Sequence, residues 1–303
     1  MSQLQPYAVM VPYYSNIAYL REALESVVRQ TDEHWWCVVV DDSPTGDGVA
    51  DLVADLVAEL HEPRIEYVRN PVTLGVAGNF NRCFELAWFR GADLAVVLHA
   101  DDLLEPGYVA AMRRAHRWSP AAACVAPKVT VIDVDGSPHR PLPDRVKTLM
   151  WPRRLDRLEG DVGLAMLLRG QFFYCPAVSY RLALLEHPAW DERWCQVMDL
   201  MLYGRLLLRD QTIALHAEPV YRYRRHAASV TQLNSASRVR TLEEIDAARE
   251  LAEAARRRGW RSAARAGRWR VSTRLQSLTQ VPSLVAHGRF GDARTACSFA
   301  ARR

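Results

Sequence analysis

The feature that most constrains the fold is an alternation of two patterns along the first third of the chain. Short, nearly continuous apolar runs end at polar residues, and each run is followed by a segment with apolar residues at helical spacing. This alternation predicts a parallel sheet covered by helices on both faces. We expect strands at Tyr7–Pro12, Trp35–Val40, Arg64–Arg69 and Leu94–Leu98, and helices at Ile17–Gln30 (capped by Asn16), Val49–Leu60 and Val76–Phe89.

The second half of the chain has a looser pattern. Residues 133–154 are rich in proline, glycine and charge, which predicts a turn followed by an irregular segment. Apolar spacing then predicts a helix near Val162–Leu168, a strand around Ala177–Tyr180, a helix around Val197–Leu208, short strands near Ile213–Leu215 and Val220–Tyr223, and Arg-rich helices within 237–275. We therefore expect one α/β domain in two halves, residues 1–134 and 135–232, with a helical extension over residues 233–303.

Polar residues follow the predicted strands at the edge where the carboxyl ends of a parallel sheet meet. Two strands end in adjacent acids, Asp41-Asp42 and Asp101-Asp102, and His99 lies two residues before Asp101. Adjacent carboxylates repel each other and resist leaving water, so a fold that gathers them usually supplies a positive charge. The first strand is not followed by the glycine-rich loop GxGxxG that holds nucleotide phosphates. A divalent metal ion between the carboxylates would supply the positive charge that they require and would hold the nucleotide phosphates in place of the missing loop.

Composition narrows the class of protein. A chain of 303 residues with 49% hydrophobic residues has enough apolar content for a packed core. No apolar run reaches the ~18 residues of a membrane span, and the first residues lack the pattern of a secretory signal. The six cysteines form no CxxC pair and no zinc-binding spacing. These features predict an intracellular protein, either cytoplasmic or attached to a membrane surface, without a disulfide framework.

Arginine is concentrated at the C-terminal end of the chain. From Thr231 onward there are 15 arginines and six acidic residues. A basic helix that carries Trp260 and Trp269 is typical of three arrangements: packing on the body of the protein, self-association as a homodimer, and peripheral contact with an anionic membrane. No recognised nucleic-acid module accompanies the charge, so we expect no nucleic-acid partner.

The chain resembles the family 2 glycosyltransferases, which have the GT-A fold, in four motifs: VPYYSNIAYLREALESVVRQT, VVVDDSPTGDG, RNPVTLGVAGNFNRCFELA and LHADDLLEPGYV. The resemblance is close over roughly residues 7–134 and weaker over residues 170–232. It implies an α/β GT-A domain with a central, mostly parallel sheet. It also implies an inverting enzyme that uses a nucleotide diphosphate sugar and a divalent ion.

The resemblance also implies roles for individual residues. Asp102 matches the second acid of the DXD-type pair, which holds Mg²⁺ or Mn²⁺ against the donor diphosphate. His226 matches a late histidine that contacts the metal or the diphosphate, with a structural role as the alternative. For Asp102 the alternative is capping of the helix that begins after Pro106. The residues expected to contact the donor are Pro12, Tyr13, Tyr14, Asp41, Asp42, Asn70, Gly75, Asn79, Asp101 and Arg225, with Arg224 as the alternative to Arg225.

Asp199 matches the family residue that deprotonates the acceptor, although Met198 stands where the family has a first acid. A carboxylate within ~3 Å of the attacking hydroxyl or amine can take its proton. The alternative is an acidic residue favoured by the dipole at the start of a helix. Gln171, Trp190 and Trp194 are expected on the acceptor side, with a place in the core as the alternative for the aromatic residues.

We predict a metal-dependent, inverting glycosyltransferase. It moves a sugar from a nucleotide diphosphate sugar to the hydroxyl or amine of an acceptor, either a small molecule such as a natural product or a surface glycan precursor. Because Met198 breaks the acidic pair, a nucleotide-sugar-binding protein of the same fold without turnover is the alternative. A nucleotidyltransferase is a third candidate, but the glycine- and lysine-bearing signature expected after the first strand is missing.

Overall fold

The computed structural model describes residues 5–44, 48–226 and 238–269, together with single residues and pairs between 274 and 298. Contacts divide the chain into two compact units. The first comprises Met1–Arg157, Phe173–Glu192 and Gln211–Arg225, and the second comprises Leu158–Phe172, Arg193–Asp210 and His226–Arg303. The division expected from the sequence, with boundaries near residues 134 and 232, is a different one and stays a prediction. In the part of the chain that is described, no helix has the length and apolar character needed to cross a membrane.

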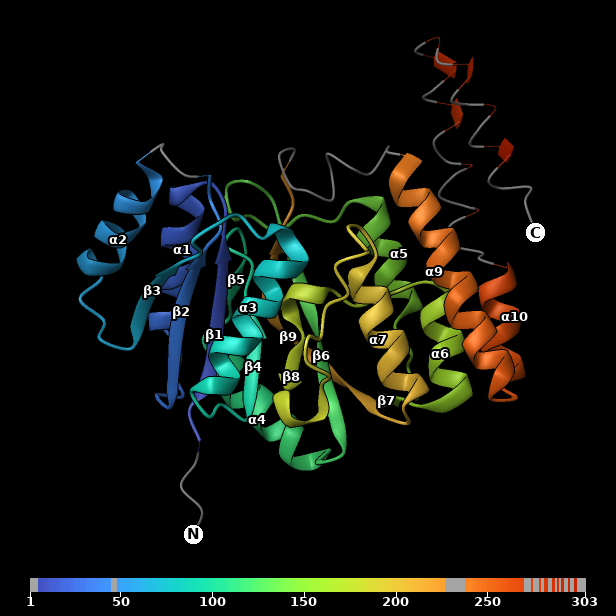
Figure 1. Ribbon diagram of the computed structural model, residues 1–303, viewed down its shortest axis with the longest axis horizontal. Coiled ribbons are helices and arrows are strands. Elements are labelled where there is room, and N and C mark those ends of the chain that lie inside the picture. The colour runs from blue at the N-terminus through green and yellow to red at the C-terminus, as the bar shows by residue number, and fades with distance from the viewer. Residues whose placement is uncertain are drawn as a thin grey trace. The chain divides into compact units, whose positions relative to one another are not determined.

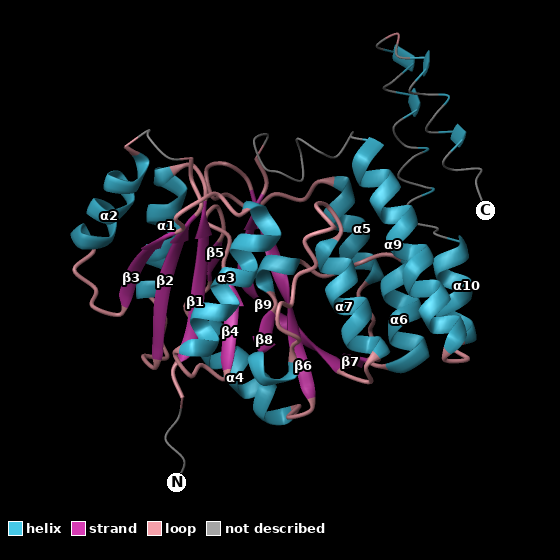
Figure 2. Cartoon of the chain, viewed as in Figure 1, coloured by secondary structure: helices cyan, strands magenta, loops and turns pink. Residues whose placement is uncertain are grey.

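A nine-stranded mixed sheet is the centre of the first unit, with helices on both of its faces (Figure 1, Figure 2). The strand order is β3-β2-β1-β4-β8-β6-β9-β5, and β7 pairs with β9. Strands β1 to β4 run parallel to one another, whereas β8 is antiparallel to β4 and β6, and β5 is antiparallel to β9. The strands are β1 (Tyr7–Tyr13), β2 (Trp35–Asp41), β3 (Ile65–Arg69), β4 (Leu94–Val97), β5 (Leu103–Leu104), β6 (Ala122–Ile132), β7 (Arg157–Leu158), β8 (Ser179–Arg181) and β9 (Thr212–Arg224).

The helices of the first unit are α1 (Ile17–Val28), α2 (Val49–Glu59), α3 (Gly75–Phe89), α4 (Tyr108–Trp118) and α5 (Leu142–Met150), with 3-10 turns at Cys175–Ala177 and Leu182–Leu184. The predicted cap of α1 is confirmed, because the Tyr19 amide donates to Asn16 Oδ1 at 3.2 Å. Between the helices, Val9, Val39 and Val96 of the central strands have no exposed surface. Strands buried on both faces need apolar residues at every position, which explains the continuous runs in the sequence.

Two expectations for the first unit are corrected. The segment 133–154 was expected to be irregular after its turn, but it contains α5. Prolines at the start of a helix are tolerated because the first amides have no helical acceptor, and Pro141 and Pro143 stand at that end. The two short strands expected near 213–215 and 220–223 are one strand, β9. Its pairing with β6 shifts register around Lys128, so Pro219 is accommodated at a bulge.

The second unit is mainly helical in the described residues. Its helices are α6 (Gly160–Arg169), α7 (Met198–Leu208), α9 (Arg238–Arg257) and α10 (Arg261–Trp269). Small residues let these helices approach closely: a Cβ added at Gly204 would come within 2.6 Å of the Leu251 side chain. Gly259, at φ +75°, lies in the turn between α9 and α10, where a left-handed conformation favours glycine. The Arg-rich helices expected within 237–275 are thus confirmed as far as residue 269.

A buried polar group links α4 to the sheet of the first unit. His116 Nε2 lies 3.0 Å from Ser179 Oγ, which also accepts a hydrogen bond from the Tyr7 hydroxyl at 2.6 Å. Burial, and then the nearby charge of Arg181, lower the pKa of His116 to about 3. The folded protein therefore holds this imidazole neutral, whereas the unfolded chain protonates it near pH 6.5.

We expect His116 to make the fold sensitive to mild acid. As the pH falls below 6.5, the unfolded state binds this proton first, so stability is lost continuously towards pH 3. Between pH 6.5 and 5 the loss amounts to roughly 2 kcal/mol in the free energy of unfolding. The variant His116→Gln keeps a hydrogen-bonding group but cannot titrate. Urea unfolding of both proteins at several pH values checks this, and parallel pH profiles for the two would contradict it.

Candidate active site

The order of the strands reverses beside β1, whose neighbours are β2 on one side and β4 on the other. In open α/β sheets, ligands bind at such a reversal, outside the carboxyl ends of the strands. Hydrogen bonds carry the pairing just past the regular strands, because the Leu98 amide donates to the Met10 carbonyl at 2.8 Å and the Asp42 amide to the Tyr13 carbonyl at 2.8 Å. The polar residues that follow β1, β2 and β4 are therefore held at one edge of the sheet.

A tight turn follows β4 and gathers three potential metal ligands. The Asp102 amide donates to the His99 carbonyl at 3.0 Å, which closes the turn. One ligand atom from each of His99, Asp101 and Asp102 lies within 4.8 Å of the others. His99 and Asp101 are partly exposed, whereas Asp102 is fully buried. His99 was not predicted as a ligand, although it lies at the end of the same strand and two residues before Asp101.

Asp102 is fixed by strand β9. Its Oδ2 accepts a hydrogen bond from the Tyr221 hydroxyl at 2.8 Å, and its Oδ1 accepts one from the Arg224 amide at 2.7 Å. Burial and the neighbouring charge of Asp101 raise the pKa of Asp102 well above its ordinary value, and the hydrogen bonds from Arg224 and Tyr221 act in the opposite direction. Helix α4 has Gly107 at its cap without a side-chain hydrogen bond, so Asp102 is not its cap.

The turn has a buried cation beside it. The Arg224 side chain is 1% exposed, and its Nε donates to the Asp101 carbonyl at 2.9 Å. Its other nitrogens contact the Val134 carbonyl at 2.8 Å and Glu22 Oε2 at 2.5 Å. Arg224 therefore supplies part of the positive charge that two adjacent acids require, and it fixes the backbone of the turn.

Arg225 has a different environment from Arg224. Its Nη2 and Nε donate to the two carboxylate oxygens of Asp144 in α5 at 2.7 and 3.1 Å. Asp144 also accepts a hydrogen bond from the Tyr174 hydroxyl at 2.6 Å, and burial followed by this hydrogen bond raises the pKa of Tyr174. In this arrangement Arg225 anchors α5, and its expected contact with the donor stays a prediction.

The residues of the turn fit a hard divalent ion. Mg²⁺ binds ligands in an octahedron at roughly 2.1 Å, so ligand atoms on opposite sides lie about 4.2 Å apart. Adjacent octahedral ligands lie roughly 3 Å apart. The ligand atoms of His99, Asp101 and Asp102, which lie within 4.8 Å of one another, would therefore have to draw closer around an ion. Two carboxylates suit Mg²⁺ or Mn²⁺, and an imidazole nitrogen adds a preference for the transition metal. The expected ligand His226 does not belong to this group of described residues, and its role stays a prediction.

Asp42 and Asn70 organise the start of α3. The carboxylate of Asp42 accepts hydrogen bonds from Asn70 Nδ2 and the Leu74 amide, both at 2.8 Å, and from the Gly75 amide at 2.9 Å. Asn79 accepts a further hydrogen bond from Asn70 at 3.0 Å. These expected donor-binding residues are thus brought together by the fold. Gly75 is exposed at φ +75°, whereas Asp42, Asn70 and Asn79 are at most 4% exposed.

The structure does not support a direct donor contact for Asp41. Its side chain has no exposed surface, and its oxygens accept hydrogen bonds from the Ser43 amide at 2.8 Å, the Tyr67 hydroxyl at 2.7 Å and Arg69 at 3.1 Å. The carboxylate therefore shapes the loop that follows β2.

Two buried polar atoms at the ends of β2 and β3 are candidates for contact with a ligand. Among the residues that the structure describes, Ser43 Oγ and Asn70 Oδ1 are buried without a hydrogen-bond partner. Such atoms are costly unless a ligand or water completes them. Tyr14, after β1, is 57% exposed, Pro12 is partly exposed and Tyr13 is buried. Ser43 was not predicted, although its position directly after Asp41-Asp42 was a usable signal.

The expected base belongs to the second unit. Asp199 lies in the first turn of α7, where its Oδ1 accepts a hydrogen bond from the Leu200 amide at 2.8 Å. Its Oδ2 accepts one from Gln171 Nε2 at 2.7 Å. The side chain of Gln171 thus lies against the carboxylate, as expected for two residues of one site. Trp194, also in this unit, is 8% exposed, and its acceptor role stays a prediction.

Trp190 is corrected from an acceptor-side residue to a core residue. It is 1% exposed in the first unit, and its ring lies 5.3 Å from that of Phe80, 6.0 Å from Phe84 and 6.1 Å from Tyr180. Asn81 fixes its backbone, donating to the Trp190 carbonyl at 2.9 Å and accepting from its amide at 2.9 Å. The alternative of a core aromatic residue is the one that the structure supports.

Residues 8–176, more than half of the chain, match the profile of glycosyl transferase family 2. The chain belongs to glycosyl transferase family 2. The expectation of a family 2 glycosyltransferase with a GT-A α/β fold is therefore confirmed. Among curated proteins, an uncharacterized protein of Mycobacterium tuberculosis (strain CDC 1551 / Oshkosh) is 28% identical over 237 residues, which cover 76% of this chain and 71% of the relative.

Solved structures share the fold of this family 2 protein. S. aureus TarS 1–349 in complex with UDP-GlcNAc is 16% identical, with a TM-score of 0.57 over 98% of this chain and 90% of that one. The mannosyltransferase PcManGT from Pyrobaculum calidifontis, in complex with GDP-Man and Mn²⁺, is 16% identical, with a TM-score of 0.55 over 99% of this chain and 85% of that one. Against a longer TarS structure, the chain spans 55% of the length.

Proposed function

We propose that this family 2 glycosyltransferase is a metal-dependent, inverting enzyme that moves a sugar from a nucleotide diphosphate sugar to an acceptor hydroxyl or amine. The observation that carries the proposal is the turn His99–Asp102, which gathers an imidazole and two carboxylates where the strand order reverses beside β1. The Mn²⁺ bound with GDP-Man in PcManGT supports the metal, and the UDP-GlcNAc bound in TarS supports the class of donor.

Different residues would have different roles in the reaction. His99, Asp101 and Asp102 would hold Mg²⁺ or Mn²⁺, while Arg224 and Tyr221 keep Asp102 and the turn in place. A divalent ion there would neutralise the negative charge that collects on the departing diphosphate. Asp42 keeps the start of α3 in position for the donor, and Ser43 Oγ and Asn70 Oδ1 offer hydrogen bonds to the nucleoside.

Asp199 is the candidate general base. In an inverting transfer the acceptor oxygen or nitrogen forms a bond to the anomeric carbon as the bond to the diphosphate breaks. The electron pair of the broken bond stays on the diphosphate, and the proton of the acceptor passes to the Asp199 carboxylate. Gln171, which donates to Asp199 Oδ2, would orient that carboxylate.

A donor-binding protein without turnover is the second candidate. One observation favours it: Met198 replaces the first acid of the family pair, and Asp199 is occupied by its own helix and by Gln171. The acceptor class, the cytoplasmic location and a homodimer stay predictions from the sequence.

Thermal unfolding with nucleotide sugars tests the proposal. UDP, GDP and TDP sugars should be compared in Mn²⁺ and in EDTA. The right donor at about 100 times its Kd is expected to raise Tm by about 5 °C in Mn²⁺ and much less in EDTA. Equal stabilisation by all three donors in both media would contradict the metal site. Stabilisation without product from any acceptor would favour the binding protein.

A further inference from the structure

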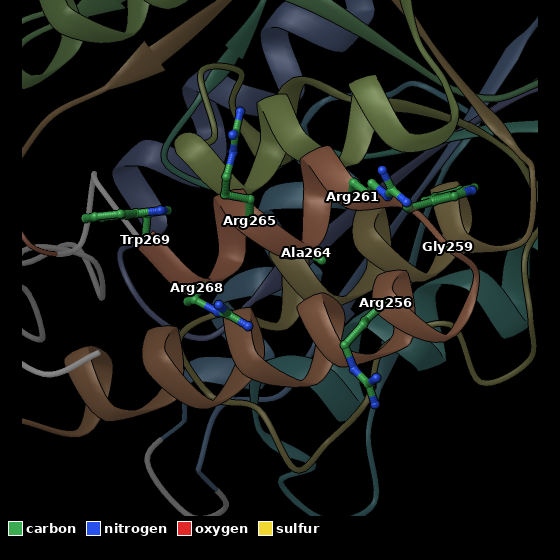
Figure 3. Close-up of a pocket in the computed structure, with 8 residues that line it drawn as sticks. Arg256, Gly259, Arg261, Ala264, Arg265, Arg268 and Trp269 are labelled. Carbon is green, nitrogen blue, oxygen red and sulfur yellow. The ribbon is translucent and has the colours of Figure 1, made fainter.

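One face of α10 is strongly cationic. Arg261, Arg265 and Arg268 are all exposed, and their spacing of four and three residues puts them on the same side of the helix. Trp269 follows at the end of the helix and is 53% exposed. Figure 3 shows these side chains projecting from α10 beside Arg256 of α9. We call this surface, made of Arg256, Arg261, Arg265, Arg268, Trp260 and Trp269, the α10 basic face.

Packing fixes which way this face points within the second unit. Ala263, Ala266 and Gly267 are buried on the opposite side of α10. A Cβ on Gly267 would come within 2.7 Å of the Ala248 carbonyl oxygen, so α10 lies directly against α9. Asp161 holds the start of the helix by accepting the Ala263 amide at 2.7 Å. The helix cannot rotate to bury its arginines without losing these contacts.

Three of the four arginines of the α10 basic face are not neutralised by an ion pair within the described residues. Within the described residues, Arg261, Arg265 and Arg268 have no acidic partner, whereas Arg256 pairs with Glu253 at 2.8 Å. Some arginines elsewhere are paired, as Arg90 is with Glu66 at 2.8 Å. Helix α10 itself contains no acidic residue. The face lines an open hollow of about 430 Å³ to which the described residues contribute arginine, tryptophan and small residues but no acid.

We propose that the α10 basic face binds the surface of a membrane that contains anionic phospholipid. Each arginine near such a surface attracts phosphate and carboxylate headgroups, and tryptophan at the rim of the face suits the boundary between headgroups and acyl chains. A symmetric contact with a second copy of the chain would place this face against itself, arginine against arginine, which is repulsive. The face thus provides a peripheral attachment.

Vesicle sedimentation tests this attachment with the whole chain. The protein should be mixed with phosphatidylcholine vesicles that contain either no phosphatidylserine or about one third of it. We expect binding only to the anionic vesicles and release in about 0.5 M salt, where charges are screened. The double variant R265E/R268E is expected to bind at least about tenfold more weakly.

The chain offers a matched control on α4. Arg114 and Arg117 have the same spacing, are exposed, and are followed by the exposed Trp118, as Arg268 is followed by Trp269. R114E/R117E makes the same change in net charge and is expected to bind as the wild type does. Circular dichroism melting shows whether both variants remain folded. A third variant, W269A, leaves the charge unchanged and is expected to weaken binding to the anionic vesicles.

Three results would overturn the proposal. Equal binding to neutral and anionic vesicles would remove the role of charge. Equal losses in R265E/R268E and R114E/R117E would show that the net charge of the protein, and not this face, decides binding. The wild-type protein could instead fail to bind vesicles and form a dimer in analytical ultracentrifugation. If R265E/R268E disrupts that dimer, the face serves self-association.

Discussion

Replacing Asp199 with asparagine is expected to lower kcat by about 10²- to 10⁴-fold, the usual contribution of a general base. The amide keeps the shape of the side chain and can still accept from the Leu200 amide, so the fold of α7 should be unchanged. Donor binding depends on other residues, so its affinity should stay within about twofold of the wild type. Steady-state kinetics with the donor and acceptor, together with calorimetric titration of the donor, measure the two effects separately.

The control for this prediction is Asp246→Asn on α9, which makes the same chemical change at an exposed position. It should leave kcat unchanged. If transfer survives Asp199→Asn intact, Asp199 is not the base, and the observed hydrogen bonds to Gln171 and Leu200 describe a structural acid at a helix start. If the wild type binds donor but transfers to no acceptor, the alternative of a binding protein gains support.

Replacing Asp101 with asparagine is expected to lower kcat/KM for the donor by at least about 100-fold in Mn²⁺, because the site loses a charged ligand. Asp101 suits this test better than Asp102, because Asp101 is partly exposed, whereas Asp102 is buried and hydrogen-bonded to β9. The fall should appear in metal affinity as well as in activity. Titration of Mn²⁺ followed by electron paramagnetic resonance measures that affinity directly.

Asp135→Asn is the control for Asp101, because Asp135 is an exposed acid of the same unit in the turn after β6. Its metal affinity should equal that of the wild type. Unchanged Mn²⁺ affinity and unchanged kcat/KM in Asp101→Asn would show that the turn after β4 does not hold the ion.

Much of the architecture could be predicted from the sequence. Strands β1, β2 and β4 are buried on both faces and therefore consist of nearly continuous apolar residues. The paired acids could also be recognised, because polar residues directly after such a strand must lie at the edge of the sheet. The helix α5 was missed because prolines and charges resemble a loop, and its position depends on Asp144 and Arg225, which are far apart in sequence.

The fine roles of the site residues could not be predicted, because they depend on partners far along the chain. Asp41 and Asp42 are neighbours, yet one is enclosed by Tyr67 and Arg69 of β3 while the other holds the start of α3. Trp190 is an aromatic residue of the kind that often lines a ligand site, yet its side chain is buried in the core. Such differences arise from side-chain direction, which a one-dimensional pattern does not contain.

The central claim is that the turn His99–Asp102 binds a divalent ion that also contacts the donor diphosphate. Electron–nuclear double resonance of Mn²⁺ bound to the wild type with a nucleoside diphosphate tests this most directly. We expect a phosphorus coupling from the diphosphate and a nitrogen coupling from His99, with the nitrogen coupling absent in His99→Ala. A bound ion with neither coupling, or a nitrogen coupling that persists in His99→Ala, would contradict the claim.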